Sequence, residues 1–153
     1  MFKSQTDTMI FTAGERAYLA DHGLGRLATL APDGSPHLQP VAVWFDPATE
    51  TVRIGGPELT RSRKYRNVLA DPRVSLVIDD QSPTPNALGQ TGRGIELRGI
   101  AEIVLLDPPL HPAFDRETLH LRPRRVIAWN LEPITGPSSG TGSHLSGYHS
   151  RDV

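Results

Sequence analysis

The stretch LTRSRKYRNV, from Leu59 to Val68, places four cations within six positions, directly after a Gly-Gly-Pro break. Thr60 is the expected N-cap of a short helix here, and the Asp-Pro pair at 71–72 is its expected end. Apolar residues recur every three to four positions between these limits, which gives the helix one face for packing. The stretch therefore predicts a short basic helix whose other side faces solvent.

The cations of this helix crowd its first turn, where the helix dipole is positive and disfavours them. They are Arg61, Arg63, Lys64 and Arg66. A bound anion would reverse this effect, because free N–H groups and the dipole attract it and the side chains add charge-assisted hydrogen bonds. The stretch indicates either a phosphate site or a solvated basic helix, and its residues alone leave both open.

Composition and charge restrict the class of protein. The 153 residues carry a net charge of −1, so the basic cluster is local, which argues against a nucleic-acid-binding protein. The chain has no cysteine, which excludes disulfides, thiolate metal sites and cysteine nucleophiles. No apolar run approaches the roughly 20 residues of a membrane span, and the first residues lack a signal-peptide pattern. We therefore expect a cytoplasmic protein that binds neither membranes nor nucleic acids.

Before the basic helix, the sequence predicts one helix and three strands. Thr12 and Glu15 have the spacing of a capping box, and Gly23 is the expected end of that helix. The segment PDGS at 32–35 predicts a turn between two strands. The three expected strands are 24–31, 37–45 and 51–55. Two short connections between them indicate an antiparallel meander.

After the basic helix, the sequence predicts three more strands and a tail. The expected strands are 74–78, 95–105 and 124–131, with a bend at Gly99 in the second of them. From Pro133 onward the composition changes to Gly, Ser, Thr and His, which predicts a disordered tail over 134–153 after a domain of residues 11–133. Six short strands with one or two short helices predict a mainly β, six-stranded antiparallel barrel, because closure removes exposed strand edges.

Several segments together resemble the pyridoxamine 5'-phosphate oxidase-like split β-barrels. The segments PDGSPH at 32–37 and SRK at 62–64 match the first hairpin and the phosphate-binding motif of that family. Residues 93–102 and 123–129 are similar to its actinobacterial branch that uses a deazaflavin, coenzyme F420. The resemblance extends from Phe11 to Pro133. It implies a split barrel that binds coenzyme F420 or FMN at a homodimer interface, with the cofactor phosphate on the basic helix.

The resemblance also indicates which residues would hold the cofactor. Ser62, Arg63 and Lys64 would bind the phosphate, and Gly55 and Gly56 would let the chain pass close to the cofactor. The residues expected to line or reach the cofactor from the strands are Gln39, Val41, Val43, Arg125 and Trp129. Ordinary sheet packing is the alternative role for the first three, core packing for Trp129, and a solvated surface position for Arg125.

No residue stands out as catalytic, and no metal site is expected. The six histidines lack the close helical spacing of a zinc site, and the Asp79-Asp80 pair is typical of a turn. A flavin or deazaflavin carries the hydride itself, so the protein need only bind and orient it. The family's true oxidases end in an Arg-containing segment that holds the pyridoxal substrate, whereas this chain has a Ser/Gly-rich tail there, so we do not expect pyridoxamine phosphate oxidation.

Two functions fit this inventory. The first is an oxidoreductase that transfers hydride from a reduced deazaflavin or FMN to a small conjugated substrate. The second is a non-catalytic flavin-binding protein that stores, senses or shields its cofactor. Both need the same phosphate site and ring groove, so the sequence does not separate them.

Overall fold

A computed structural model describes residues 9–132 and 147–153 of the chain. Within this part, seven strands and two α-helices form, together with one short 3-10 helix. The strands are β1 (Leu24–Leu30), β2 (Pro36–Asp46), β3 (Thr51–Ile54), β4 (Arg73–Gln81), β5 (Gly92–Leu105), β6 (Glu117–Trp129) and β7 (Tyr148–Asp152). The helices are α1 (Ala13–Asp21), η1 (Leu59–Arg61) and α2 (Arg63–Ala70).

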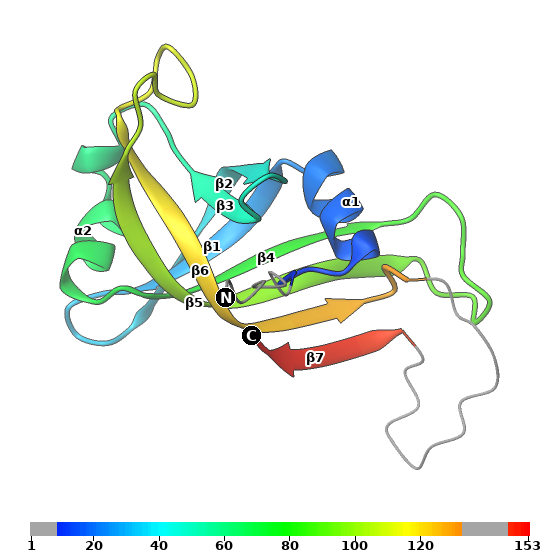
Figure 1. The fold of residues 1–153 in the computed structure, drawn as a ribbon. Helices are drawn as coiled ribbons and strands as arrows, with labels where there is room; N and C mark the ends of the chain where they lie inside the picture. The colour runs from blue at the N-terminus through cyan, green and yellow to red at the C-terminus, as the bar shows by residue number, and fades with distance from the viewer. Residues whose placement is uncertain (1–8, 133–146) are drawn as a thin grey trace, which may run out of the picture.

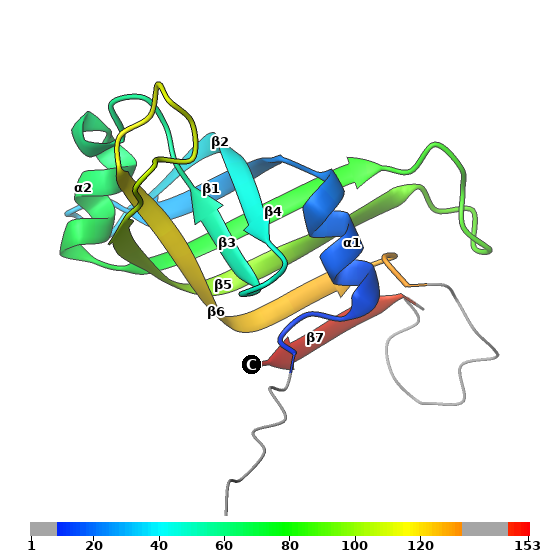
Figure 2. The same cartoon turned by 45° about the horizontal axis from the view of Figure 1, so that its top comes forward.

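The strands form one antiparallel sheet that closes on itself. Neighbouring strands follow the order β3-β2-β1-β4-β5-β6-β7, and an additional pairing between β3 and β6 closes the first six into a barrel. Strand β7 lies outside the barrel, along the edge of β6 (Figures 1 and 2). The predicted mainly β, six-stranded split barrel is therefore confirmed. Closure pairs the edges that such short strands would otherwise expose.

The first hairpin forms where the sequence alternates between apolar and polar or small residues. In β1, Leu27 and Thr29 are buried, whereas Arg26 and Ala28 alternate with them and are partly exposed. The turn before β2 contains Gly34, whose φ of 83° lies in the left-handed region that glycine adopts at little cost. Buried hydrophobic residues from each of the six barrel strands pack into one hydrophobic core.

Strand β6 begins at Glu117 rather than at Arg124, so the predicted start was wrong. The reason is Pro123, which interrupts the strand pattern and usually marks a strand edge or a bulge. In the structure Pro123 lies opposite Gly99, where the register between β5 and β6 shifts by a β-bulge. The bend predicted at Gly99 is thereby confirmed, and it accommodates the proline inside a long strand.

The two α-helices lie at opposite ends of the barrel (Figure 1). Helix α1 has the predicted capping box between Thr12 and Glu15. Helix α2 has Ser62 as its N-cap, and the prediction of Thr60 was wrong because that residue belongs to the preceding 3-10 helix. None of the described helices is long and apolar enough to cross a membrane.

The end of the chain is ordered, contrary to the prediction of a disordered tail over 134–153. Residues 147–153 contain β7, which pairs with β6 from Tyr148 opposite Trp129 to Asp152 opposite Arg125. Arg151 of this strand binds the buried carboxylate of Glu15 in α1. The rest of the predicted tail, residues 133–146, lies outside the described residues.

Candidate functional site

The N-terminus of α2 carries the predicted phosphate-binding residues on a firmly held turn. Ser62 Oγ donates to the carbonyl of Leu59 at 2.6 Å and accepts from the N–H of Tyr65 at 3.3 Å. The helix is anchored to β1 by Asn67, whose Nδ2 donates to Thr29 Oγ1 at 3.0 Å in the interior. These contacts fix the direction in which the first turn of α2 points.

Three of the four cations at this turn have no acidic partner in the described part of the chain. Arg63 and Arg66 are exposed and Lys64 is half-buried. Among residues 9–132 and 147–153, the side chains of these three cations form no ion pair or hydrogen bond, whereas Arg61 binds Glu58 at 3.3 Å. Burial lowers the pKa of Lys64, because desolvation disfavours its charged form. A bound anion would relieve that cost.

The backbone of the same turn offers further donors. Helices leave their first N–H groups without intrahelical partners, and Ser62 satisfies that of Tyr65 only. The N–H groups of Arg63 and Lys64 form no hydrogen bond to the part of the chain that the structure describes. Two backbone donors and two cationic side chains therefore converge on one turn, and this donor set fits a phosphate group.

The connection between β5 and β6 supports this turn from the side. Asp115 Oδ2 accepts from the N–H and the hydroxyl of Thr60, at 3.0 and 2.9 Å. The hydrogen bond from the Thr60 backbone lowers the pKa of Asp115, so the carboxylate is ionised at neutral pH. The backbone N–H of Asp115 donates to the carbonyl of Gly56 at 3.3 Å. The connection thus ties the end of β3 to the start of the basic segment.

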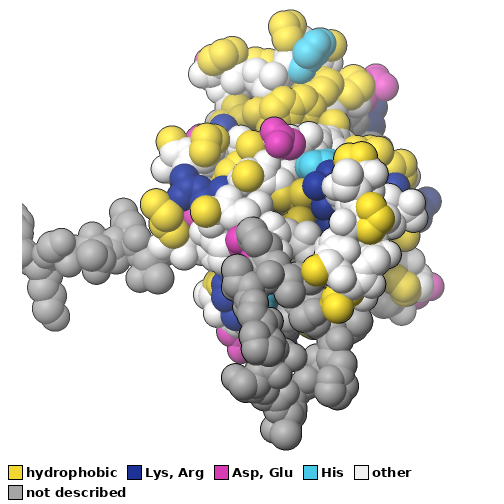
Figure 3. Space-filling view, turned by 90° about the vertical axis from the view of Figure 1, so that its right-hand side faces the viewer, with side chains coloured by type: hydrophobic (Ala, Val, Ile, Leu, Met, Phe, Trp, Pro, Cys, Tyr) yellow, Lys and Arg dark blue, Asp and Glu magenta, His cyan; other side chains and the backbone are white. Residues whose placement is uncertain are grey.

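The two predicted glycines have different surroundings. A Cβ on Gly55 would lie 3.2 Å from Leu110 and from Phe114, so this glycine packs beneath the β5–β6 connection. A Cβ on Gly56 would have no atom of the described chain within 4 Å, so its backbone is open to the described surroundings beside the basic segment. Hydrophobic side chains gather on this connection at the top of the molecule (Figure 3). Of the two, Gly56 is the one whose backbone a ligand can approach.

The predicted residues of β2 lie on one face of the strand. Gln39 is half-buried, whereas Val41 and Val43 are buried in the hydrophobic core. The valine side chains therefore pack inside the barrel, as the alternative interpretation of ordinary sheet packing predicts. Only the backbone of Val41 and Val43 is available to a ligand outside the barrel.

Trp129 and Arg125 lie on β6, away from the basic helix. Arg125 Nη1 binds Asp152 at 2.8 Å, so its charge is already paired. Trp129 lines a cavity of about 520 Å³, with Tyr148 beside it on β7. The lining residues are Gln90, Gly92, Glu96, Ile127, Trp129, Asn130 and Tyr148.

The structure therefore does not bring all the predicted residues together within one chain. Strand β4 begins just after α2, and its last residue, Gln81, pairs with Gly92 of the cavity. Its nine residues, at about 3.3 Å each, span roughly 26–30 Å. The basic turn and the Trp129 cavity thus lie toward opposite ends of the barrel (Figure 1).

Two features of the site could not be anticipated from sequence patterns. Tyr148 sits in a segment whose composition predicted disorder, and Asp115 lies in a proline-broken connection that showed no motif. Asn130 gives one weak signal, since an Asn that follows a strand favours the left-handed conformation it adopts here, with φ of 55°. Its side chain then reaches Gln90 and Gly92 at the rim of the cavity.

A second polar cluster lies near α1. Asp80 accepts from Tyr18 Oη at 2.8 Å and from Arg93 Nε at 2.8 Å, and His22 Nε2 is 3.3 Å away. The Arg93 hydrogen bond lowers the pKa of Asp80, while burial and the Asp80 hydrogen bond raise that of Tyr18. Each polar group has a partner, so the cluster has a structural role that joins α1 to the β4–β5 hairpin. Within the described residues, no group of acidic and histidine side chains is arranged to hold a metal ion.

The closed six-stranded barrel with a basic helix turn beside it defines a split-barrel protein. The sequence model described as pyridoxamine 5'-phosphate oxidase matches residues 11–130, and the chain belongs to that family. A curated relative, the 5a,11a-dehydrotetracycline/5a,11a-dehydrooxytetracycline reductase of Streptomyces rimosus subsp. rimosus, is 34% identical over 146 residues. That alignment covers 95% of this chain and 94% of the relative. The chain is an oxidoreductase of this family.

Solved structures agree with the fold. A structure named F420 reductase is 27% identical, with a TM-score of 0.54, over 76% of this chain and 98% of that one. A conserved hypothetical protein from Mycobacterium tuberculosis is 21% identical, with a TM-score of 0.64, over 94% and 99% of the two chains. An FAD binding protein from Mycobacterium smegmatis is 19% identical, with a TM-score of 0.55, over 76% and 92%. The last two likenesses show the fold alone.

Proposed function

We propose that the protein is a homodimeric oxidoreductase that binds coenzyme F420, or alternatively FMN, and passes hydride to a small conjugated substrate. The observation that carries this proposal is the unneutralised basic turn of α2. Arg63 and Lys64 there offer two side-chain cations and two backbone N–H groups to one anion. Both cofactors present a phosphate and a flat tricyclic ring, and either would supply hydride transfer when bound.

The residues of this chain then have separate tasks. Lys64 and Arg63 neutralise the phosphate, and Ser62 holds the turn that presents them. Asp115 keeps Thr60 and the open backbone of Gly56 in place beside it. Gln39 lies on the same face of β2 as the buried Val41 and Val43, and we assign its half-buried side chain to the ring. None of them needs to act as a nucleophile or a proton carrier.

The distance between the two halves of the candidate site supports a homodimer. A cofactor phosphate on α2 and the Trp129 cavity of the same chain lie toward opposite ends of the barrel (Figure 1). In a symmetric pair, the cavity of one copy can face the basic turn of the other. The outer face of the β1–β2 hairpin supports a dimer, because its apolar side chains Leu24 and Leu38 are 56% and 65% exposed in the single chain.

Coenzyme F420 is favoured over FMN. The support comes from the resemblance of residues 93–102 and 123–129 to the deazaflavin branch and from the likeness to a solved F420 reductase. The Streptomyces relative acts on a dehydrotetracycline, which supports a conjugated ring compound as the hydride acceptor.

The test is a titration of cofactor-free protein with F420 and with FMN, followed by anaerobic mixing of the reduced complex with 5a,11a-dehydrotetracycline. We expect tighter binding of F420 and oxidation of the bound cofactor by the added acceptor. Binding of FMN that is tighter by about tenfold, or 1.4 kcal/mol, would overturn the preference for F420. Binding of either cofactor without turnover by any conjugated acceptor would contradict the enzymatic proposal.

A further inference from the structure

We propose that the cavity between β5, β6 and β7 binds a flat, multi-ring acceptor, with Trp129 and Tyr148 against its rings and Glu96 accepting a hydrogen bond from it. This inference rests on the proposed function, because it assigns a subsite and a chemical class to the hydride acceptor. It gives the C-terminal strand a role in binding that its composition did not predict.

The apolar part of the cavity is a platform of aromatic and aliphatic side chains. Trp129 and Tyr148 are direct partners in the β6–β7 register, and Ile127 lies two residues before Trp129 on the same face. Ile127 is only 4% exposed but does not belong to the hydrophobic core of the barrel, so it packs on the outer side of the sheet. A cavity of about 520 Å³ falls in the range that holds a small organic ligand.

Two glycines shape this platform for a planar ligand. Gly94 pairs with Trp129, and a Cβ on it would lie 2.5 Å from Trp129 Cζ2, so the indole packs directly over the glycine. A Cβ on Gly92 would meet no atom of the described residues within 4 Å, so these residues leave that end of the cavity open. Two aromatic side chains beside an open stretch of backbone favour stacking of fused rings over binding of a compact or branched ligand.

Polar groups line one edge of the cavity and are held in position. Glu96 Oε1 accepts from Arg98 Nε at 2.6 Å and from Ser75 Oγ at 3.1 Å. Within the described residues, Glu96 Oε2 makes a single contact, of 3.4 Å to Arg98 Nη2, so it has capacity left for a phenolic or enolic hydroxyl.

The opposite rim is made of amides. Asn130 Nδ2 donates to the carbonyl of Gly92 at 2.7 Å and to Gln90 Oε1 at 3.3 Å, while Asn86 Nδ2 donates to Asn130 Oδ1 at 3.3 Å. These bonds join the β4–β5 loop to the end of β6. A rim fixed in this way suits a ring system that carries hydroxyl and carbonyl groups along its edges.

The test measures binding of tetracycline, a stable four-ring compound, to the cofactor-free protein by calorimetry. Tyr148→Ser is compared with His149→Ser, its neighbour on the same strand, which does not line the cavity. We expect Tyr148→Ser and Trp129→Leu each to weaken tetracycline binding by about tenfold, which corresponds to 1.4 kcal/mol. His149→Ser should bind as the wild type does, and melting curves should show that all variants are folded.

Titration of the same variants with cofactor distinguishes a failure of this inference from a failure of the proposed function. The inference predicts that Tyr148→Ser leaves F420 and FMN affinity unchanged. Unaltered tetracycline binding in both Tyr148→Ser and Trp129→Leu would overturn the inference. An equal loss of affinity for tetracycline and for the cofactor would also overturn it, because the cavity would then be part of the cofactor site. If the wild type binds tetracycline but neither cofactor, the proposed function fails while the ring-binding cavity stands.

Discussion

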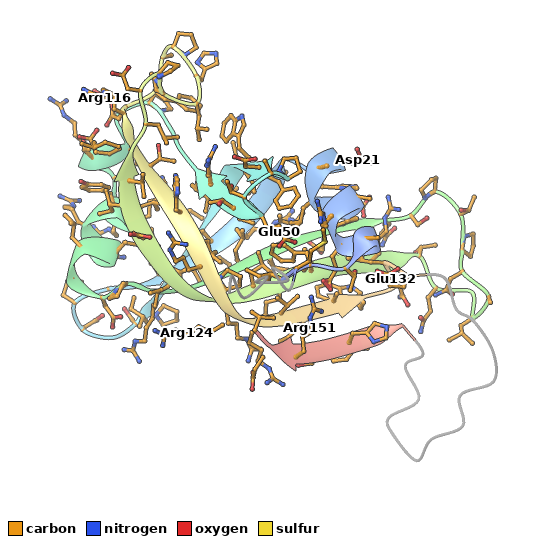
Figure 4. All side chains as sticks on the ribbon, viewed as in Figure 1. Asp21, Glu50, Arg116, Arg124, Glu132 and Arg151 are labelled. Atoms are coloured by element: carbon orange, nitrogen blue, oxygen red, sulfur yellow. The ribbon has the colours of Figure 1, made fainter. Side chains whose placement is uncertain are left out.

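Arg151 and Glu15 form a two-pronged ion pair that joins the last strand of the chain to the first helix. The Nη1–Oε1 and Nη2–Oε2 distances are 2.6 and 2.7 Å, and Glu15 is 2% exposed. Figure 4 shows Arg151 extending from β7 toward α1. Arg151 also donates to the carbonyl of Ile10 at 2.6 Å. The final strand is therefore part of the folded domain, and its arginine is engaged inside the protein.

Replacing Arg151 by Met should destabilise the protein, because it leaves the buried carboxylate of Glu15 without its partner. Removing one member of a buried pair costs about 3–5 kcal/mol of stability. Because Arg151 is partly exposed, we expect a loss near or below the lower end of this range. Melting curves should show a fall of several degrees. Arg125→Met, which removes an exposed pair with Asp152, should change the melting temperature little. Equal effects of the two changes would contradict this role for Arg151.

Gly99→Ala should also destabilise the protein, through the backbone. A Cβ at this position would overlap the carbonyl oxygen of Arg122, which belongs to the neighbouring strand at the β-bulge. Overpacking typically costs about 1–3 kcal/mol, and here the obstacle is main chain that cannot rotate away. Gly92→Ala is the matched control, because a Cβ there meets no atom within 4 Å among the residues that the structure describes. Chemical denaturation of both variants measures the difference, and a Gly99→Ala protein as stable as the control would refute the bulge argument.

The sequence was sufficient where local pattern and tertiary structure agree. The alternation in β1 and the Asp33-Gly34 turn predicted the first hairpin, and Thr12 with Glu15 predicted the first helix. The sequence was not sufficient where a contact with a distant residue determines the local structure. The choice of Ser62 over Thr60 as N-cap depends on Asp115, 55 residues away, which binds Thr60 instead. Strand β7 depends on pairing with β6 and on Glu15, and a Gly- and Ser-rich composition gives no sign of either.

The same limit applies to the candidate site. The SRK motif at 62–64 located the basic turn correctly, because helix ends and charge are local properties. The roles of Val41 and Val43 were not readable, since β2 is apolar on both faces for much of its length and its inward side is fixed only by closure of the barrel. Which residues meet Trp129 was likewise undetermined, because Glu96 and Tyr148 approach it from other strands.

His120 should make stability depend on pH. Burial lowers its pKa, as do the charges of Arg53 on β3 and Arg122 on β6, against an opposing effect of Glu102 on β5. The folded state thus resists protonation, whereas the unfolded chain titrates near a pKa of about 6.5. Between these two values the unfolded state binds more protons, so stability falls as pH is lowered. His120→Leu should flatten this fall when unfolding is followed by denaturant from about pH 8 to pH 5, and an unchanged slope would rule out His120 as its source.

The homodimer should be visible in solution and should depend on the β1–β2 face. Sedimentation of the cofactor-bound protein at micromolar concentration should give a dimer, with an interface of about 2,000 Å² or more. Leu38→Glu places a charge on a side chain that is 65% exposed in the single chain, so it should shift the protein toward monomer without unfolding it. Leu105→Glu, at a leucine on β5 that is 60% exposed, is the control. A wild type that sediments as a monomer would count against the dimer.

Proton linkage gives a further check on the basic turn. Burial lowers the pKa of Lys64 in the cofactor-free protein, and a bound phosphate should raise it again. Cofactor affinity should therefore decrease as pH rises and the free protein loses this charge. The measurement is a cofactor titration repeated at increasing pH, with Lys64→Arg as a variant that keeps its charge throughout. A pH dependence that is the same in wild type and Lys64→Arg would mean that Lys64 does not titrate with binding.

The central claim is that the first turn of α2 holds the cofactor phosphate, and a fluorescence titration of cofactor into four proteins tests it directly. Lys64→Ala and Arg63→Ala each remove one charge-assisted contact, worth about 1.5–3 kcal/mol, so affinity should fall roughly ten- to a hundredfold. Arg66→Ala, one turn further along the helix, should matter less. Melting of the cofactor-free variants should be unchanged or slightly higher, because a cation leaves the positive end of the helix dipole. Wild-type affinity in both Lys64→Ala and Arg63→Ala would contradict the phosphate site and the cofactor assignment that depends on it.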